Sequence, residues 1–163
     1  FYLNAYNANV LAGILDAWPT ESPMKIKGFF KVHKRTVAGR EMTLDQLEHE
    51  LIRPTFEEPR IHFVLVCAAK SCPPLRTTPL TEANLEEVLS TATEAFIPRV
   101  TELKDDTVRT SQLFNWFSDD FKGAAGSVAK YLAKYTDGEV EEALQKEGVE
   151  IDFREYDWAV NKQ

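Results

Sequence analysis

The sequence is short of cysteine, of basic charge and of long apolar runs, and each shortage excludes a class of protein. Only two cysteines occur, Cys67 and Cys72, which is too few for a disulfide scaffold but leaves one bridge possible. The formal net charge of −7 argues against a nucleic-acid partner and disfavours an anionic membrane partner, because both need a basic surface. No apolar run approaches the roughly 18 residues that a membrane span needs. We therefore expect no nucleic-acid partner and no membrane span.

Motifs for cofactors and for targeting are also lacking. There is no P-loop and no G-x-G-x-x-G, so no motif supports nucleotide binding. Cys67, Cys72, His49 and His62 are residue types that bind zinc, but no compact pair of them has a standard ligand spacing. We therefore expect no metal and no cofactor. No signal-peptide pattern is present, but the chain begins at Phe1 inside a helical pattern, so we expect a truncated or processed N-terminus and assign no compartment.

The length and the patterning favour one soluble α+β domain spanning residues 1–163. A chain of 163 residues that is 44% hydrophobic suits a single core. Helices are predicted over 1–17, 43–53, 81–97, 111–122, 127–134 and 139–146, and strands over 28–40 (a hairpin), 61–67, 100–109 (a hairpin) and 149–153. The first helix has an apolar stripe, Leu3, Val10, Leu11, Ile14 and Leu15, the second begins with a capping-box pattern of Thr43 and Gln46, and the first hairpin has Ala38-Gly39 near its turn. Trp18-Pro19, Pro54 and Pro98 are each expected to end the preceding helix. We expect the helices to pack on a small mixed or antiparallel sheet.

The segment from Arg60 to Arg76 is where we expect any chemistry to lie. Ile61–Cys67 is β-branched and almost wholly apolar, which is typical of a strand buried on both faces. Cys72 follows in a proline-rich loop, and loops at strand ends commonly carry functional side chains because a rigid scaffold positions them. The neighbouring Lys70 would favour a thiolate at Cys72 by lowering the pKa of the thiol.

A nucleophilic thiol needs an imidazole within reach and a third group that orients it. His62 begins the predicted strand, about six residues of roughly 3.3 Å each before its end, so the loop must double back to bring Cys72 to it. His49 lies on the preceding helix and is less constrained. Asp45, four residues earlier, can reach its imidazole along one helix face, whereas Glu48 points elsewhere. His33, in a basic hairpin, is the weakest candidate.

Five stretches, in family order, resemble motifs of the DUF547 family, a domain of unknown function found in bacteria, archaea, plants and nematodes. They are Asn4-Ala5-Tyr6-Asn7, Leu47-Glu48-His49 with Ile52-Arg53, Arg60-Ile61-His62-Phe63 through Ser71-Cys72-Pro73, Trp116 with Asp120-Phe121, and Tyr156-Asp157-Trp158 with Asn161. Leu47 stands where isoleucine is usual, Ile52 and Val160 where leucine is usual, Val64 for alanine and Ala69 for serine. None of these departures touches a cysteine or a histidine. The resemblance implies that the polar residues on the motifs form a site, and His33 is not among them.

Our leading hypothesis is a cysteine-dependent hydrolase or acyltransferase with chemistry, and possible architecture, of the papain or transglutaminase kind. The expected catalytic residues are Cys72 as nucleophile, His49 or else His62 as base, and Asp45 or Glu48 as the group that orients the imidazole. The expected substrate-binding residues are Asn4, Asn7, Arg53 and Lys70. The expected oxyanion donor is Asn7 or the backbone N–H groups around Cys72.

Two alternatives stay open. The first is a non-catalytic module that binds an unknown small molecule, peptide or protein, with the polar motif residues forming a buried network. The second is a redox-sensing pair of Cys67 and Cys72, whose C-x4-C spacing differs from the C-x-x-C of thioredoxin-type proteins. A bridge across so short a loop would add modest stability.

Overall fold

The computed structural model describes residues 1–162, and its helices and two small sheets confirm the predicted α+β class. Its contacts divide the chain into two compact units. Unit 1 consists of Phe1–Glu57, Phe63–Glu86 and the tail that begins at Asp157, and unit 2 consists of Glu58–His62 and Glu87–Tyr156. A single domain over the whole chain, and an architecture like that of papain or transglutaminase, both stay predictions. Among residues 1–162, no helix combines the length and the apolar character needed to cross a bilayer.

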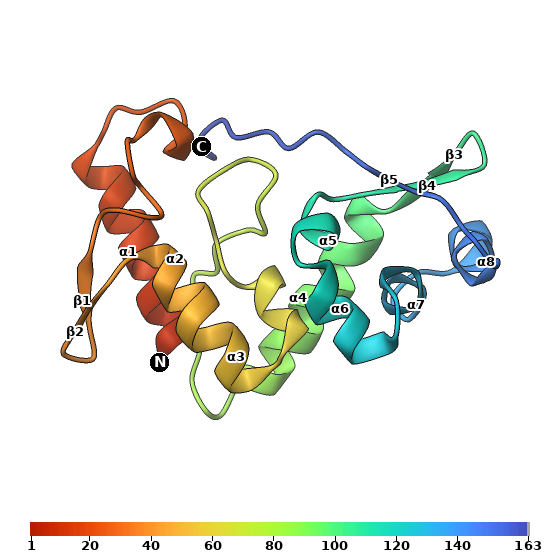
Figure 1. The fold of residues 1–163 in the computed structure, drawn as a ribbon, viewed down its shortest axis with the longest axis horizontal. Helices are drawn as coiled ribbons and strands as arrows, with labels where there is room; N and C mark the ends of the chain where they lie inside the picture. Colours follow the sequence, from red (N-terminus) through yellow and green to blue (C-terminus); the bar gives the residue numbers. More distant parts are fainter. Residues whose placement is uncertain (163) are drawn as a thin grey trace. The chain divides into compact units, whose positions relative to one another are not determined.

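Unit 1 is a group of helices with one short hairpin beside the first of them (Figure 1). Its elements are α1 (Tyr2–Asp16), η1 (Pro23–Lys25), β1 (Arg35–Val37), β2 (Arg40–Met42), α2 (Leu44–Gln46), η2 (Leu47–Ile52) and α3 (Arg53–Phe56). β1 and β2 pair antiparallel, and Ala38 and Gly39 at their turn both have positive φ. A two-residue hairpin turn of the common primed type needs that conformation, so the predicted turn is confirmed.

Helix α1 buries one face, but not the whole stripe that the sequence predicts. Tyr6, Val10 and Ile14 are buried at a spacing of four residues. Leu11 and Leu15, which the prediction placed on the same stripe, are 40% and 71% exposed. The apolar stripe is therefore wider than the face that unit 1 covers.

The predicted 28–40 hairpin begins too early, because the chain turns at Gly28 and the first strand, β1, covers only Arg35–Val37. Gly28 has φ of +74°, and its carbonyl accepts hydrogen bonds from the N–H groups of Val32 (2.8 Å) and His33 (3.1 Å). The turn directs Phe29 into the unit, against α1 at Gly13. A Cβ on Gly13 would lie 2.7 Å from the Phe29 ring, so the ring needs a glycine there. The hairpin proper is confined to Arg35–Met42.

The helix predicted over 43–53 is present, and it starts as predicted. The side chain of Thr43 accepts from the Gln46 N–H, and the side chain of Gln46 accepts from the Thr43 N–H, which is a capping box. The predicted end at Pro54 is wrong, because η2 is a π-helical stretch and α3 continues through Pro54 to Phe56. Pro54 directly follows the π-helical stretch, as the second residue of α3.

The strand predicted over Ile61–Cys67 is also wrong. Pro59–Phe63 forms the 3₁₀ helix η3, and residues 64–66 run buried without belonging to a sheet. The run is apolar because it is buried, and its backbone groups are satisfied by a side chain rather than by a neighbouring strand, as described below. A short apolar run does not distinguish these two cases.

Unit 2 contains most of the remaining elements, with α7 packed against both α6 and α8 (Figure 1). They are α4 (Leu85–Val100), β3 (Glu102–Lys104), β4 (Thr107–Thr110), α5 (Leu113–Trp116), α6 (Ser118–Ala125), α7 (Val128–Ala133), α8 (Gly138–Gln145) and β5 (Ile151–Phe153). β3 and β4 pair antiparallel, and β4 and β5 pair parallel, which confirms a small mixed sheet. α4 begins at Leu85 rather than residue 81 and continues through Pro98 to Val100, so the predicted end at residue 97 is wrong by three residues.

We predict that Gly28→Ala destabilises the protein more than Gly39→Ala. Both glycines have positive φ, so each alanine costs roughly 1–2 kcal/mol of backbone strain. At Gly28 the new Cβ would also lie 2.6 Å from the Val32 Cβ, whereas at Gly39 nothing lies within 4 Å. Overpacking adds about 1–3 kcal/mol. Urea unfolding of both variants measures the difference, and equal losses of unfolding free energy would contradict the close approach at Gly28.

Candidate functional site

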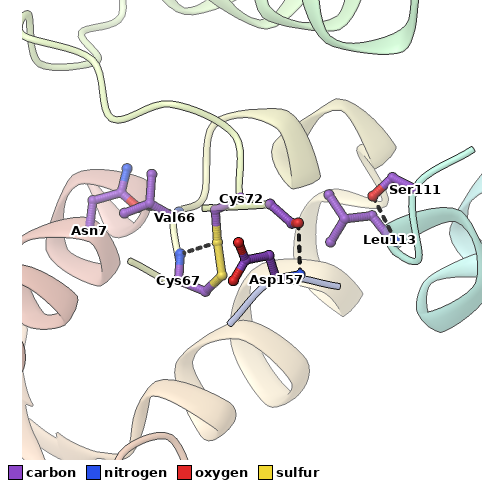
Figure 2. Close-up of a disulfide and its surroundings, with 8 residues drawn as sticks. Asn7, Val66, Cys67, Cys72, Ser111, Leu113 and Asp157 are labelled. Carbon is purple, nitrogen blue, oxygen red and sulfur yellow. Dashed lines mark hydrogen bonds between the residues drawn. A yellow bond between two sulfur atoms is a disulfide. The ribbon is translucent and has the colours of Figure 1, made fainter. Parts of the chain in front are cut away.

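The two cysteines are joined in a disulfide within unit 1 (Figure 2). Their Cα atoms lie 6.0 Å apart, an ordinary separation for a bridge. The N–H of Cys67 donates a hydrogen bond to the Cys72 sulfur at 3.0 Å. Cys72 is 6% exposed, whereas Cys67 is half-buried. The thiol predicted as a nucleophile is therefore held in a covalent pair, which is the disulfide that the second alternative required.

Asn7 holds the backbone that leads into the disulfide. Its amide nitrogen donates to the Val64 carbonyl at 2.8 Å, and its amide oxygen accepts from the Val66 N–H at 3.0 Å. The carboxamide thus takes the place of one peptide group of a neighbouring strand, which is why residues 64–66 need no sheet. Both ends of the Asn7 amide are thus occupied by backbone groups. Substrate binding by Asn7 stays a prediction.

Asn4 makes the same kind of contact one turn earlier on α1. Its amide nitrogen donates to the Leu80 carbonyl at 2.7 Å, and its oxygen accepts from the Leu80 N–H at 3.0 Å. The two asparagines, three residues apart on one helix, hold both ends of the loop that carries the disulfide. Substrate binding by Asn4 likewise stays a prediction.

The residues between the cysteines, 68–71, bond to the C-terminal tail, residues 157–162. The Lys70 N–H donates to the Ala159 carbonyl at 2.9 Å, and the Asn161 N–H donates to the Ala68 carbonyl at 2.8 Å. The Ser71 hydroxyl accepts from the Asp157 N–H at 2.9 Å. Ala69 and Val160 form an isolated antiparallel bridge. The disulfide loop, residues 67–72, is therefore docked on the tail through all four residues between its cysteines.

The ammonium of Lys70, predicted to act on the thiol or on a substrate, is paired with the tail. Its Nζ lies 3.9 Å from an Asp157 carboxylate oxygen, and both side chains are more than half exposed. An exposed pair at this distance holds the side chain only weakly, with a worth of roughly 0–1 kcal/mol. The charge of Lys70 is thus shared with Asp157.

His49 and Asp45 are paired along one helix face, as the sequence predicts. The His49 Nε2 lies 3.8 Å from an Asp45 carboxylate oxygen. On its other side, the His49 Nδ1 lies 2.8 Å from the Arg53 guanidinium. Arginine can only donate, so Nδ1 accepts and the ring carries its proton on Nε2, toward Asp45. This tautomer commits the ring's lone pair to Arg53.

Glu48 lies within the π-helical stretch η2, where the Arg53 N–H donates to the Glu48 carbonyl, five residues back. Glu48 is 8% exposed, and its carboxylate makes no hydrogen bond or ion pair with residues 1–162. It does not orient the His49 ring, consistent with the expectation that it points elsewhere on the helix. Insertions of this π type are frequent at functional sites.

His62 lies in unit 2, where a carboxylate and an aromatic ring hold it. Its Nε2 lies 2.7 Å from an Asp120 carboxylate oxygen, and its side chain is 1% exposed. The Phe117 ring stacks on the imidazole, with centroids 3.8 Å apart. Asp120 was not among the predicted site residues. The resemblance of Asp120-Phe121 to a family motif was the signal that could have indicated it.

Other residues on the family motifs of unit 2 build structure. Arg60 donates to both carboxylate oxygens of Glu58, at 2.8 and 2.6 Å. Burial raises the pKa of Glu58, but these hydrogen bonds and the charge of Arg60 outweigh it, so the net pKa is lowered. Burial raises the pKa of Tyr156, whose ring packs on Trp116 with centroids 4.9 Å apart.

Across residues 1–162, no group of three or more His, Cys, Asp or Glu is arranged to hold a metal ion.

We predict that Asp120→Ala destabilises unit 2 by about 1–3 kcal/mol, because it leaves a buried imidazole nitrogen without its partner. Asp119→Ala is the matched control, since that side chain is 91% exposed and its pair with Lys122 is worth roughly 0–1 kcal/mol. Thermal unfolding of both variants gives the comparison. Equal stability of the two would mean that the His62–Asp120 contact is energetically neutral.

Comparison with curated proteins and with solved structures found no match. A family model described as "Protein of unknown function, DUF547" matches residues 1–97, which is more than half of the 163-residue chain. The matched range contains the disulfide, both clamping asparagines of α1 and the Asp45–His49–Arg53 group. The resemblance noted from the motifs is thus confirmed, and the chain belongs to the DUF547 family.

Proposed function

We propose that the chain is a redox-responsive module, in which Cys67 and Cys72 alternate between a disulfide and a dithiol. The observation that carries the proposal is the disulfide itself, formed by the two cysteines of the sequence across four intervening residues. The C-x4-C spacing separates the pair from thioredoxin-type catalysts, so we assign it a sensing role rather than general disulfide exchange.

The exposure of the two cysteine residues favours attack at Cys67 over attack at Cys72. Residue Cys67 is half-buried, whereas residue Cys72 is 6% exposed, so the thiolate of a low-molecular-weight thiol reaches Cys67 more easily. A bond forms from the reductant to the Cys67 sulfur, the Cys67–Cys72 bond breaks, and the electron pair stays on Cys72. The Cys67 N–H, at 3.0 Å, stabilises this thiolate as a leaving group. A second thiol then releases Cys67, giving two protein thiols and one reductant disulfide.

The tail provides a readout for this change. Residues 68–71 lie between the cysteines and hold the tail through backbone hydrogen bonds and the Ser71 hydroxyl. Opening the bridge removes the covalent closure of this loop and adds backbone freedom to it, worth about 2 kcal/mol in the loop-entropy model. The added freedom weakens the hydrogen bonds between residues 68–71 and the tail, because Asn7 still holds residues 64–66, which precede the loop.

We predict that the pair reaches equal oxidised and reduced populations at a potential above about −300 mV, where regulatory rather than structural disulfides lie. The protein is equilibrated in buffers of a thiol and its disulfide, trapped with a maleimide and weighed by mass spectrometry. Hydrogen exchange of the same samples should show faster exchange at residues 159–161 after reduction and no change at β3 and β4.

Ser71→Ala is the control for the readout, because it removes the acceptor for the Asp157 N–H while leaving both cysteines. It should speed tail exchange in both redox states. A midpoint well below −300 mV, or tail exchange that is identical before and after reduction, would identify a purely structural bridge and end the proposal.

A second candidate function is acyl transfer by the reduced form, with Cys72 as nucleophile and His49 as base. The Asp45–His49 pair favours it, since a carboxylate that holds an imidazole is part of such a triad. Arg53 opposes it, because its hydrogen bond occupies the Nδ1 lone pair that a base needs. Catalysis of this kind therefore requires Arg53 to leave His49 when substrate binds.

We predict for this candidate that a Cys67→Ser variant, in which Cys72 is a free thiol, shows an alkylation rate that rises with pH around a midpoint below the ordinary thiol pKa of about 8.5. Adding His49→Ala should return this midpoint to about 8.5. Adding Arg53→Met, which frees Nδ1 of His49, should keep the midpoint low. The rate of iodoacetamide reaction against pH is the measurement. A midpoint that stays unchanged on adding His49→Ala would rule out His49 as the partner of Cys72.

A further inference from the structure

Positive charge is concentrated in one stretch of this acidic chain, the basic segment Ser22–Arg40. The segment has six Lys and Arg and no Asp or Glu, whereas the remaining residues carry 13 Lys and Arg against all 26 Asp and Glu. Charges farther than about 8 Å are largely screened at physiological ionic strength. Among residues 1–162, four carboxylates touch the segment, those of Asp16, Glu21 and Asp45 as ion pairs and that of Glu41 through Thr36, so its six cations exceed them by two, and a partner there meets a local positive excess rather than the net charge of −7.

The fold turns this segment outward. The positive φ of Gly28 and the seat of Phe29 against Gly13 fix the segment on unit 1. Phe29 is 4% exposed, whereas the side chain of Lys31, two residues later, is 78% exposed. One buried ring thus anchors a segment whose cations face solvent.

Half of the cations in the segment have no partner within the described chain. Three pair with carboxylates: Lys25 with Glu21, Lys31 with Asp45 and Arg35 with Asp16. The side chains of Lys27, Lys34 and Arg40 make no hydrogen bond or ion pair with residues 1–162. These three are available to an anionic partner without breaking a contact that the fold needs.

Exposed apolar side chains accompany the cations. Met24 is 59% exposed and Val32 is 67% exposed, both inside the basic segment, and Trp18, four residues before it, is 52% exposed. A soluble polyanion uses the cations and has no use for these aliphatic groups. A membrane surface uses both, because lysine and arginine meet the lipid headgroups while aliphatic and tryptophan side chains enter the interface.

We propose that the basic segment docks unit 1 on the surface of a membrane that contains anionic lipids. The contact is peripheral, with Lys27, Lys34 and Arg40 at the headgroups and Met24 and Val32 at the acyl boundary. The whole-chain charge predicted no such partner, because the average over 163 residues hides a segment of opposite sign.

The test is co-sedimentation of the protein with phosphatidylcholine vesicles that contain about 30% phosphatidylserine, compared with pure phosphatidylcholine vesicles. Binding is expected only to the anionic vesicles, and it should weaken at least tenfold when salt is raised from 0.05 to 0.5 M. Reversing the unpaired cations, in the triple variant Lys27→Glu, Lys34→Glu and Arg40→Glu, should weaken it by about 100-fold or more.

Two further variants separate this partner from others. Lys104→Glu with Lys130→Glu and Lys146→Glu makes the same change in net charge on exposed lysines of unit 2, and it should retain most of the binding. Met24→Ser with Val32→Ser should weaken vesicle binding by about tenfold with the charges intact. Circular dichroism checks that each variant is folded.

Three results would overturn the proposal. The first is no binding of the wild-type protein to anionic vesicles. The second is an equal loss in the unit 2 control, which would mean that net charge alone matters. The third is tighter binding to polyglutamate or to a single-stranded oligonucleotide that Met24→Ser with Val32→Ser leaves unchanged, which would assign the segment to a soluble acidic partner.

Discussion

The amide of Asn7 is the contact on which the candidate site in unit 1 depends. Residues 64–66 are buried and carry peptide groups that need partners, and among residues 1–162 no strand lies beside them in a sheet. Asn7 supplies a donor to Val64 and an acceptor to Val66 from one rigid, planar group. Because the disulfide begins at Cys67, one residue later, its position relative to α1 is set by this side chain.

On its other side, the disulfide loop meets the C-terminal tail and not a second rigid element. The tail is also bonded to the chain through the Val160 N–H, which donates to the Glu21 carbonyl at 2.8 Å. Glu21 immediately precedes the basic segment, so the tail lies between the disulfide loop and the proposed docking surface within unit 1.

The geometry around His49 limits what the reduced form can do. The sequence places Asp45, His49 and Arg53 at successive spacings of four, and the structure brings all three together. The same spacing that supplies a carboxylate to orient the ring also supplies a guanidinium that occupies its lone pair. A helix face of this kind is therefore as consistent with a stable ion-pair ladder as with a catalytic base.

Local chemistry determined several features of this protein in advance. The α1 helix, the capping box at Thr43, the hairpin turn at Gly39 and the Asp45–His49 pair could all be read from neighbouring residues, because each rests on contacts within a few positions. The family could be read from motifs spread along the chain. Only the tertiary structure decided the rest. A buried apolar run at 61–67 became a 3₁₀ helix and an extended segment because a distant asparagine satisfied its backbone, and Asp120 joined His62 from 58 residues away. Burial and hydrogen-bond partners depend on which segments meet, and no pattern along one segment contains that information.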